Sequence, residues 1–420
     1  MIQSISLLPG ITLQCFPDSR FKQGCLSVQL LRPMAGEEAA LNALLPAVLL
    51  RGTVRDPDLR CITQHLDDLY GAAVSTVVRR VGDYQTTGLY CSFIDDRFAF
   101  SSDRVLEPMI QFLGELLLQP LTVDGCFHPE FVESEKRNLI AAIHARRNDK
   151  RLYASDRLMA LMCKADSFGI PRLGDAENVA RITPKILWDH YLRLLRESPI
   201  ALFYVGSAAP ETVANALKAV FTPLQRQVLP LPSQSSFRDG GDVREEERME
   251  VSQGKLAMGF VTPITLRHPE FVAMQVCNTV LGAGMTSKLF MNIREKNSLC
   301  YDIGSGYHGS KGIVAVSAGI DFDKKDAVCR QVEAQLADCA AGNISDAELS
   351  AAEEALLSSL RGTHDSPGAI EGYYATAALS GMSMTPAQYM DAVAAVSRED
   401  VARAAQTLRL HSVYFLRGVQ

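Results

Sequence analysis

The residues of this sequence that are best suited to acid–base or metal chemistry are its eight histidines. They are His65, His128, His144, His190, His268, His308, His364 and His411. The segment HLDDLY places Asp67 and Asp68 after His65. Residues two and three positions further on do not both share the face of a helix with the histidine, so this segment makes a poor metal site. We therefore expect each of these lone histidines to lie on a solvated face.

Other chemical motifs are missing or incomplete. The sequence contains no G-x-S-x-G, and LGAGMTSK does not have the G-x-x-x-x-G-K-[ST] spacing of a phosphate loop. The ten cysteines lie at wide, irregular intervals without a C-x-x-C, and most have apolar neighbours. This pattern predicts small buried hydrophobic side chains in a reducing cytosol, and it argues against a metal or disulfide framework.

Arg294 and Tyr301 are the remaining residues with a chemical use. Guanidinium and phenol groups both donate hydrogen bonds, and donors aimed at a developing oxyanion stabilise the transition state of acyl transfer. From spacing alone, however, a surface ion pair for Arg294 and a place at the edge of the core for Tyr301 are the favoured interpretations.

Composition sets limits on the class of protein. The chain has 420 residues, which predicts two to three domains, and 47% hydrophobic with 21% charged residues is the balance of a globular protein. A net charge of −6 argues against a nucleic-acid surface. The N-terminus lacks a basic n-region, and no apolar run approaches the roughly 18 residues of a membrane helix. We expect a cytoplasmic protein that binds neither nucleic acid nor membrane.

The elements that must position these residues fall into two similar halves. A polar stretch rich in Pro and Gly predicts a linker at 229–250, between domains at 1–228 and 251–420. Each half closes with a capped helix and a strand, ending at Gly206 and Gly418, an offset of 212 residues. A weak internal duplication is therefore plausible.

Strands and helices are mixed without strict alternation within each half. GCLSVQLLRPM, TTGLYCSFIDD, GKLAMGFVTP and GIVAVSAGIDF are typical of strands, whereas EEAALNALLPAVLLR, VLEPMIQFLGELLLQP and MTSKLFMNIREK are typical of helices. This order predicts an α+β fold of two α/β sandwich domains, each a mostly antiparallel sheet with helices on one face.

Three segments resemble one known family. Residues 280–321, with Ser-Lys-Leu-Phe, Arg-Glu-Lys and Leu-x-Tyr, resemble the C-terminal domain of the pitrilysin and mitochondrial-processing-peptidase family of zinc peptidases (inverzincins). LLRGT resembles the end of that family's metal-binding helix, and residues 153–191 resemble its domain-closing segment. The resemblance covers nearly the whole chain and implies two homologous domains of the LuxS/processing-peptidase-like fold.

The resemblance also shows what this chain lacks. Active members carry H-x-x-E-H on the helix before Gly-Thr, where two histidines share a zinc ion and the glutamate takes a proton from bound water. Those three positions fall here on Ala43, Pro46 and Ala47, which neither bind metal nor accept a proton. Glu135 is retained on a later helix, but the third-ligand position falls on Ala142. We expect no zinc in this chain.

Arg294 and Tyr301 match the pair that the family supplies from its C-terminal domain to hold substrate. Dimeric members divide the work between a zinc-bearing chain and a zinc-free chain that contributes this pair. The resemblance thus implies a zinc-free substrate-binding subunit, with an H-x-x-E-H chain as partner, a peptide as substrate, and zinc only in the partner. The short turn GAGMTS departs from the long glycine-rich loop of the mitochondrial non-catalytic subunit, which argues against presequence recognition.

Two alternatives from other classes remain. One is a structural or peptide-binding homodimer without a proteolytic role, since a fold does not fix a function. The other is a hydrolase that uses an unrecognised site.

Overall fold

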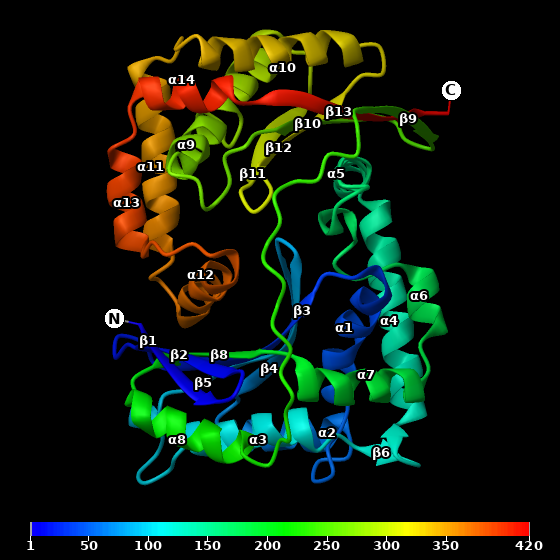
Figure 1. Cartoon of the computed structure of the whole chain (residues 1–420), viewed down its shortest axis with the longest axis vertical. Helices are drawn as coiled ribbons and strands as arrows, with labels where there is room; N and C mark the ends of the chain where they lie inside the picture. The colour runs from blue at the N-terminus through cyan, green and yellow to red at the C-terminus, as the bar shows by residue number, and fades with distance from the viewer. Residues whose placement is uncertain (1, 420) are drawn as a thin grey trace. The chain divides into compact units, whose positions relative to one another are not determined.

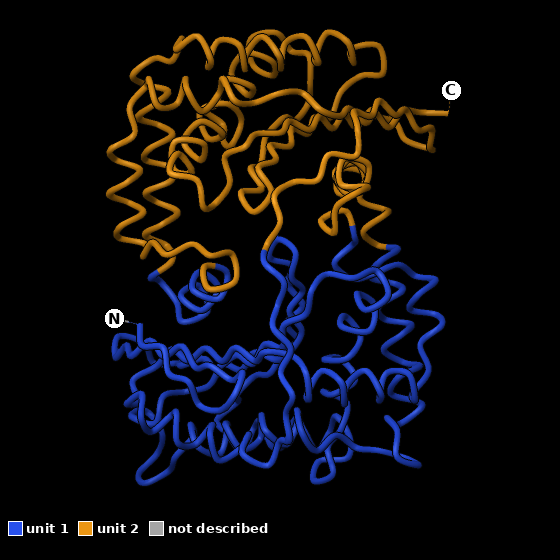
Figure 2. The backbone as a smooth tube through the Cα atoms, viewed as in Figure 1, with its two compact units in different colours: residues 1–144, 170–233, 364–376 blue, residues 145–169, 234–363, 377–420 orange. Residues whose placement is uncertain are grey.

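Two β-sheets organise the chain, and each belongs to its own compact unit. The computed structural model describes residues 2–419. Unit 1 comprises residues 1–144, 170–233 and 364–376, and unit 2 comprises residues 145–169, 234–363 and 377–420 (Figure 2).

Unit 1 is built on a six-stranded sheet of order β1-β2-β8-β3-β5-β4 (Figure 1). Its strands are β1 Gln3–Leu8, β2 Ile11–Pro17, β3 Gln23–Pro33, β4 Ala73–Val81, β5 Tyr84–Ile94 and β8 Ile200–Gly206. All neighbours pair antiparallel except β2 and β8, which run parallel. The central strand β3 is buried along most of its length, as its apolar sequence predicts, whereas β4 is an edge strand.

Helices of unit 1 enclose an apolar core against this sheet. They are α1 Gly36–Leu49, α2 Leu59–Asp68, α3 Leu106–Leu118, α4 Pro129–Asn148 as far as residue 144, α6 Ala176–Arg181, α7 Pro184–Glu197 and α8 Pro210–Phe221. The first residues of α12 Pro367–Ser380 also belong to unit 1. A small hairpin, β6 Thr122–Val123 with β7 Cys126–Phe127, follows α3. Leu44, Leu113, Leu187 and Leu202 are almost completely buried in this core, and burial of each such side chain contributes about 1.5–3 kcal/mol.

Unit 2 is built on a five-stranded sheet of order β11-β12-β10-β13-β9 (Figure 1). Its strands are β9 Val243–Met249, β10 Gly254–Val261, β11 Asp302–His308, β12 Ile313–Ile320 and β13 Arg409–Gly418. Its helices are α5 Lys150–Met162, α9 Phe271–Leu281, a π-helix Leu289–Lys296, α10 Lys325–Ala340, α11 Asp346–Gly362, α13 Pro386–Ala394 and α14 Arg398–Gln406.

The two sheets share one plan. In each, a parallel pair (β2 with β8, β9 with β13) is followed by three strands that are added antiparallel, and β1 is an extra strand of unit 1. The closing strands β8 and β13 end at Gly206 and Gly418, where the sequence places them. The α+β fold class predicted from the sequence is confirmed.

Three details differ from the sequence-based predictions. β9 lies inside the predicted linker 229–250, because a charged edge strand has no apolar alternation to reveal it. The segment MTSKLFMNIREK forms a π-helix only from Leu289. The compact units also depart from the predicted division into 1–228 and 251–420, since residues 145–169 pack in unit 2 and residues 364–376 pack in unit 1.

Two broader expectations can be compared with the fold. Seven of the ten cysteines are buried and the other three are partly buried, as apolar surroundings predict. None of the helices described between residues 2 and 419 has the length and apolar character needed to cross a membrane.

Candidate functional site

A pocket of about 580 Å³ opens in unit 1 beside α1. Its lining comes from α1, β4 and α4, together with the segments around Arg172 and Glu371. Ala43, Ala47, Glu135 and Ala142 all line it, so the structure brings together residues that lie up to 99 positions apart in the sequence (142 − 43). Pro46 is buried but is not among the lining residues.

The lining chemistry does not suit a zinc ion. Alanine side chains have no donor atom, and no histidine or cysteine lines this pocket in the part of the chain that the structure describes. Glu135 forms an ion pair with Arg51, with 3.0 Å between Oε1 and Nη1, and accepts a hydrogen bond from Asn138. Arg51 therefore neutralises the carboxylate that the sequence retains, and the family's catalytic zinc does not fit here.

Glu371, a residue that sequence reasoning missed, closes another side of the pocket. Its side chain is 1% exposed and forms an ion pair with Arg79 of β4, with 2.8 Å between Oε2 and Nη2. It also accepts hydrogen bonds from Ser27 and Gln29 of β3, at 2.7 and 2.9 Å. Because Glu371 lies about 340 residues from β3 in sequence, no local pattern could have identified it.

The helix that carries the alanines continues through Pro46. Proline has no N–H, so the carbonyl of Asn42 loses its partner within the helix. The hydroxyl of Thr87 on β5 donates to that carbonyl at 2.6 Å instead. Ala43 and Ala47 therefore remain on one face of α1 and line the same pocket despite the proline.

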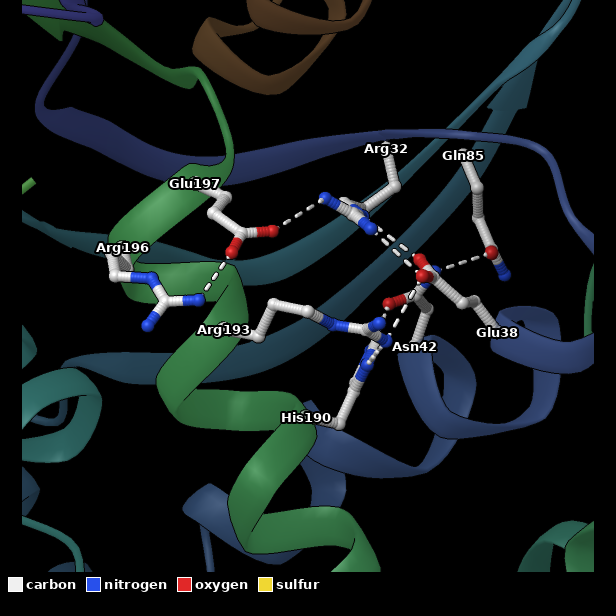
Figure 3. Close-up of polar contacts among 8 residues, drawn as sticks. All are labelled: Arg32, Glu38, Asn42, Gln85, His190, Arg193, Arg196 and Glu197. Carbon is white, nitrogen blue, oxygen red and sulfur yellow. Dashed lines mark hydrogen bonds and ion pairs between the residues drawn. The ribbon is translucent and has the colours of Figure 1, made fainter. Parts of the chain in front are cut away.

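A buried histidine fixes the opposite side of α1 (Figure 3). His190 of α7 lies 2.7 Å from Oδ1 of Asn42 through Nε2, and Nη2 of Arg193 lies 2.9 Å from its Nδ1. Since a guanidinium group only donates, Nδ1 accepts and Nε2 carries the proton. Burial, with the nearby Arg193 and Arg32, lowers the pKa of His190 to about 4. The expectation that every lone histidine is solvated is thus wrong for His190, and it is also wrong for the buried His411 of β13.

The same network continues into the sheet (Figure 3). Asn42 donates to Gln85 of β5 at 2.8 Å, and Gln85 donates to the backbone carbonyls of Ala39 and Arg172. At the start of α1, Glu38 forms an ion pair with Arg32 of β3 at 2.7 Å. Hydrogen bonds and ion pairs therefore tie α1 to α7 and to two strands, which makes it a rigid wall of the pocket.

Arg294 and Tyr301 lie together in unit 2. Nε of Arg294 donates to the backbone carbonyl of Tyr301 at 2.9 Å, and its Nη1 lies 3.1 Å from Glu295. Tyr301 is 57% exposed, and its hydroxyl donates to Asp321 at 2.7 Å. This hydrogen bond raises the pKa of Tyr301 above its ordinary value. Tyr301 is therefore an exposed side chain and does not lie at the edge of the core.

Fold and site together define a peptidase-like protein of two similar units, in which the metal-binding helix carries no metal ligand. Residues 181–356 match the family model of the peptidase M16 inactive domain. The chain is similar to inactive homologues in the M16, or pitrilysin-like, peptidase family.

Individual relatives agree with this assignment. The chain is 26% identical over 411 residues to the probable inactive metalloprotease YmfF of Bacillus subtilis. The alignment covers 98% of this chain and 96% of YmfF. A conserved protein of Enterococcus faecalis V583 has a similar solved structure, with a TM-score of 0.93, 24% identity, and coverage of 99% of this chain and 98% of that one. The peptidase M16 inactive domain of Pseudomonas fluorescens matches with a TM-score of 0.81, 16% identity, and coverage of 100% and 98%. These two structures show the shared fold.

Proposed function

We propose that this chain is the zinc-free subunit of a two-chain processing metallopeptidase. In this proposal a homologous H-x-x-E-H chain holds the zinc ion and performs the hydrolysis. The present chain contributes Arg294 and Tyr301, which hold the peptide substrate at the partner's zinc. It has no hydrolytic activity of its own.

The observation that carries the proposal is the accessible Arg294–Tyr301 pair. Arg294 uses Nε to hold the backbone of Tyr301, so the two residues are positioned as one group. The Tyr301 ring remains largely exposed even though its hydroxyl bonds to Asp321. A hydroxyl that donates a solvent-exposed hydrogen bond can donate to a substrate carbonyl instead, at a small cost in free energy.

The pocket of unit 1 supports the same proposal. Alanines occupy the ligand positions, and Arg51 pairs with Glu135, so the chain's own pocket cannot activate water through a metal. A donor pair that acts on a metal-bound peptide carbonyl therefore needs a catalytic metal that another chain supplies.

Co-expression tests the proposal directly. The chain is produced with an H-x-x-E-H homologue encoded in the same genome, and the purified pair is assayed with a peptide library. Tyr301→Phe and Arg294→Ala should each lower kcat of the pair by roughly 100-fold, as loss of an oxyanion donor does. Tyr70→Phe, which also removes an exposed hydroxyl bonded to an aspartate, and Arg330→Ala, at an exposed position of α10, are the matched controls.

Two results would overturn the proposal. One is unchanged activity of the pair in both variants, and the other is peptidase activity of the isolated chain that a partner does not increase.

The position of β4 favours a second function, peptide binding by the chain alone. β4 is the edge strand of its sheet, and its residues 75–79 line the pocket. An edge strand beside a pocket is the arrangement that binds an extended peptide as an added strand. A homodimer that binds peptides in the absence of any H-x-x-E-H relative would favour this function over the first.

A further inference from the structure

A second group of metal-ligating side chains lies in unit 1, away from the alanine-lined pocket. Asp56, His65 and Glu115 place one possible ligand atom each within 4.8 Å of one another. None of the three lines the pocket that contains Ala43 and Ala47. The family resemblance assigns no role to these residues, and the spacing of His65 from Asp67 and Asp68 gave no indication of the group.

Three separate elements position the group. Asp56 lies in the loop after α1, where its N–H donates to the hydroxyl of Thr53 and its carbonyl accepts from the N–H of Thr53. His65 lies on α2, and its ring packs against Phe112 of α3 with 4.3 Å between ring centroids. Glu115 follows Phe112 by one helical turn, so α3 presents both to the same space.

The polar contacts within the group favour a bound cation. His65 Nδ1 and Asp56 Oδ2 are 2.8 Å apart, within hydrogen-bonding distance. Glu115 Oε2 is buried and has no hydrogen-bond partner among the described residues, although Oε1 lies 3.5 Å from the largely exposed Arg55. A buried carboxylate oxygen without a donor is unfavourable unless a positive charge is present.

We propose that Asp56, His65 and Glu115 bind a divalent transition-metal ion of the zinc class. One imidazole and two carboxylates form a donor set that zinc accepts, and ligand atoms around one tetrahedral zinc lie roughly 3.4 Å apart. The metal takes the place of the hydrogen between His65 Nδ1 and Asp56 Oδ2, which is released to solvent as a proton, and it supplies the partner that Glu115 Oε2 lacks. Three protein ligands leave the fourth position to water.

The metal joins the loop after α1, α2 and α3 at one point. This site is independent of the proposed subunit role, in which zinc is absent from the catalytic position at Ala43 and Ala47, because neither Arg294 nor Tyr301 belongs to it. Zinc found in the purified protein would therefore not show that the positions of Ala43 and Ala47 bind metal.

Titration calorimetry with zinc chloride on the full-length, tag-free chain stripped with EDTA tests the proposal. We expect one zinc ion per chain and an affinity that falls at least about 100-fold in His65→Gln, since even the loss of a residue that only orients a ligand costs 10–100-fold. Glu115→Gln should weaken binding in the same direction. Glu135→Gln and His144→Gln, outside the group, should bind zinc as the wild type does.

The fluorescence of Trp188, the single tryptophan, reports whether each variant is folded. Cobalt in place of zinc gives a visible spectrum that should be lost in His65→Gln. Absence of zinc binding by the wild type overturns the proposal, as does equal affinity in folded His65→Gln and Glu115→Gln. Loss of binding in Glu135→Gln alone overturns it too, because that result places the metal in the alanine-lined pocket.

Discussion

Unit 1 and unit 2 follow the same strand plan, and each is completed by a segment from the other half of the sequence. Residues 145–169, which contain α5, pack in unit 2, and residues 364–376, the start of α12, pack in unit 1. Each inserted segment is anchored by a buried ion pair. Asp166 pairs with Lys311 in unit 2 at 3.0 Å, and Glu371 pairs with Arg79 in unit 1 at 2.8 Å.

The two anchors differ in their access to water. Lys311 is fully buried, and Asp166 also accepts from the backbone of Phe168 and of Arg238. The Arg79 side chain is 30% exposed and lies at the pocket. The buried ion pair of unit 2 is therefore purely structural, whereas the ion pair of unit 1 also lies where a ligand in the pocket can reach it.

Equivalent places in the two units also carry different chemistry. His65 lies eight residues before the start of β4 at Ala73 (73 − 65), and Arg294 lies eight residues before the start of β11 at Asp302 (302 − 294). His65 faces two carboxylates, whereas Arg294 holds the backbone of an exposed tyrosine. The same distance in sequence from corresponding strands therefore carries two different groups of side chains.

The largest expected effect tests the fully buried anchor. Asp166→Ala leaves the Lys311 ammonium buried without a counter-charge, which should lower the free energy of unfolding by about 4 kcal/mol. Urea unfolding followed by far-UV circular dichroism measures the loss. Asp391→Ala, at an exposed position of α13, should change it by no more than about 0.5 kcal/mol. Equal losses of stability in Asp166→Ala and Asp391→Ala would show that the Asp166–Lys311 ion pair does not stabilise the fold.

The unit 1 anchor should contribute less. Glu371→Ala removes the acceptor of three side chains, but Arg79 can turn into water, so we expect a loss of about 2–3 kcal/mol. Trp188 lies on α7 in unit 1, so its fluorescence in urea follows this unit. Exposed Glu354→Ala is the control. A loss larger than that of Asp166→Ala would reverse the comparison.

A pH titration sharpens the contrast on the α1 side of unit 1. The pKa of His190 is about 4 in the folded chain and about 6.5 when it is unfolded, so between these values the unfolded chain binds the extra proton. Stability is therefore lost as pH falls below 6.5. Between pH 6.5 and pH 5 the wild type should lose about 1.5 kcal/mol more than His190→Gln, measured by Trp188 fluorescence in urea. Parallel pH profiles for the two proteins would contradict the assignment.

The smallest effect concerns the proline, which α1 contains and α9 does not. Thr87→Val leaves the buried carbonyl of Asn42 without a donor, at a cost of about 1–2 kcal/mol. In a Pro46→Ala background the restored N–H supplies a donor, so the same change should cost about 1 kcal/mol less. A double-mutant cycle by urea unfolding measures this coupling. Strict additivity would mean that Thr87 does not compensate for the proline.

Local patterns revealed the apolar strands and the ends of both units. β3, β5, β10 and β12 are apolar enough to be predicted, and the glycines that end β8 and β13 were located correctly. The edge strands β4 and β9 were missed because exposed or charged residues hide their period. An alternating apolar pattern arises only where one face of a strand is buried. An edge strand buries too little of its surface to show that pattern.

The candidate site was predictable in part. Alignment to a family motif located Ala43, Ala47 and Ala142, and these residues do meet in one pocket. Glu371 and the partnership of Arg51 with Glu135 were beyond reach, because both depend on contacts between distant segments. The Asp56–His65–Glu115 group likewise joins a loop to two helices, so no short window contains it.

The exchange of segments has a consequence for synthesis on the ribosome. A domain of ordinary connectivity can fold once its own stretch of chain has emerged, and N-terminal domains generally fold first. Unit 1 contains residues up to 144 and residues 170–233, but it also needs residues 364–376, which begin 131 positions after residue 233 (364 − 233). Until that segment is made, Ser27, Gln29 and Arg79 lack Glu371, the acceptor of their hydrogen bonds. Unit 1 is therefore finished only after most of unit 2 has been made, and its pocket takes its final form only when the segment 364–376 has emerged.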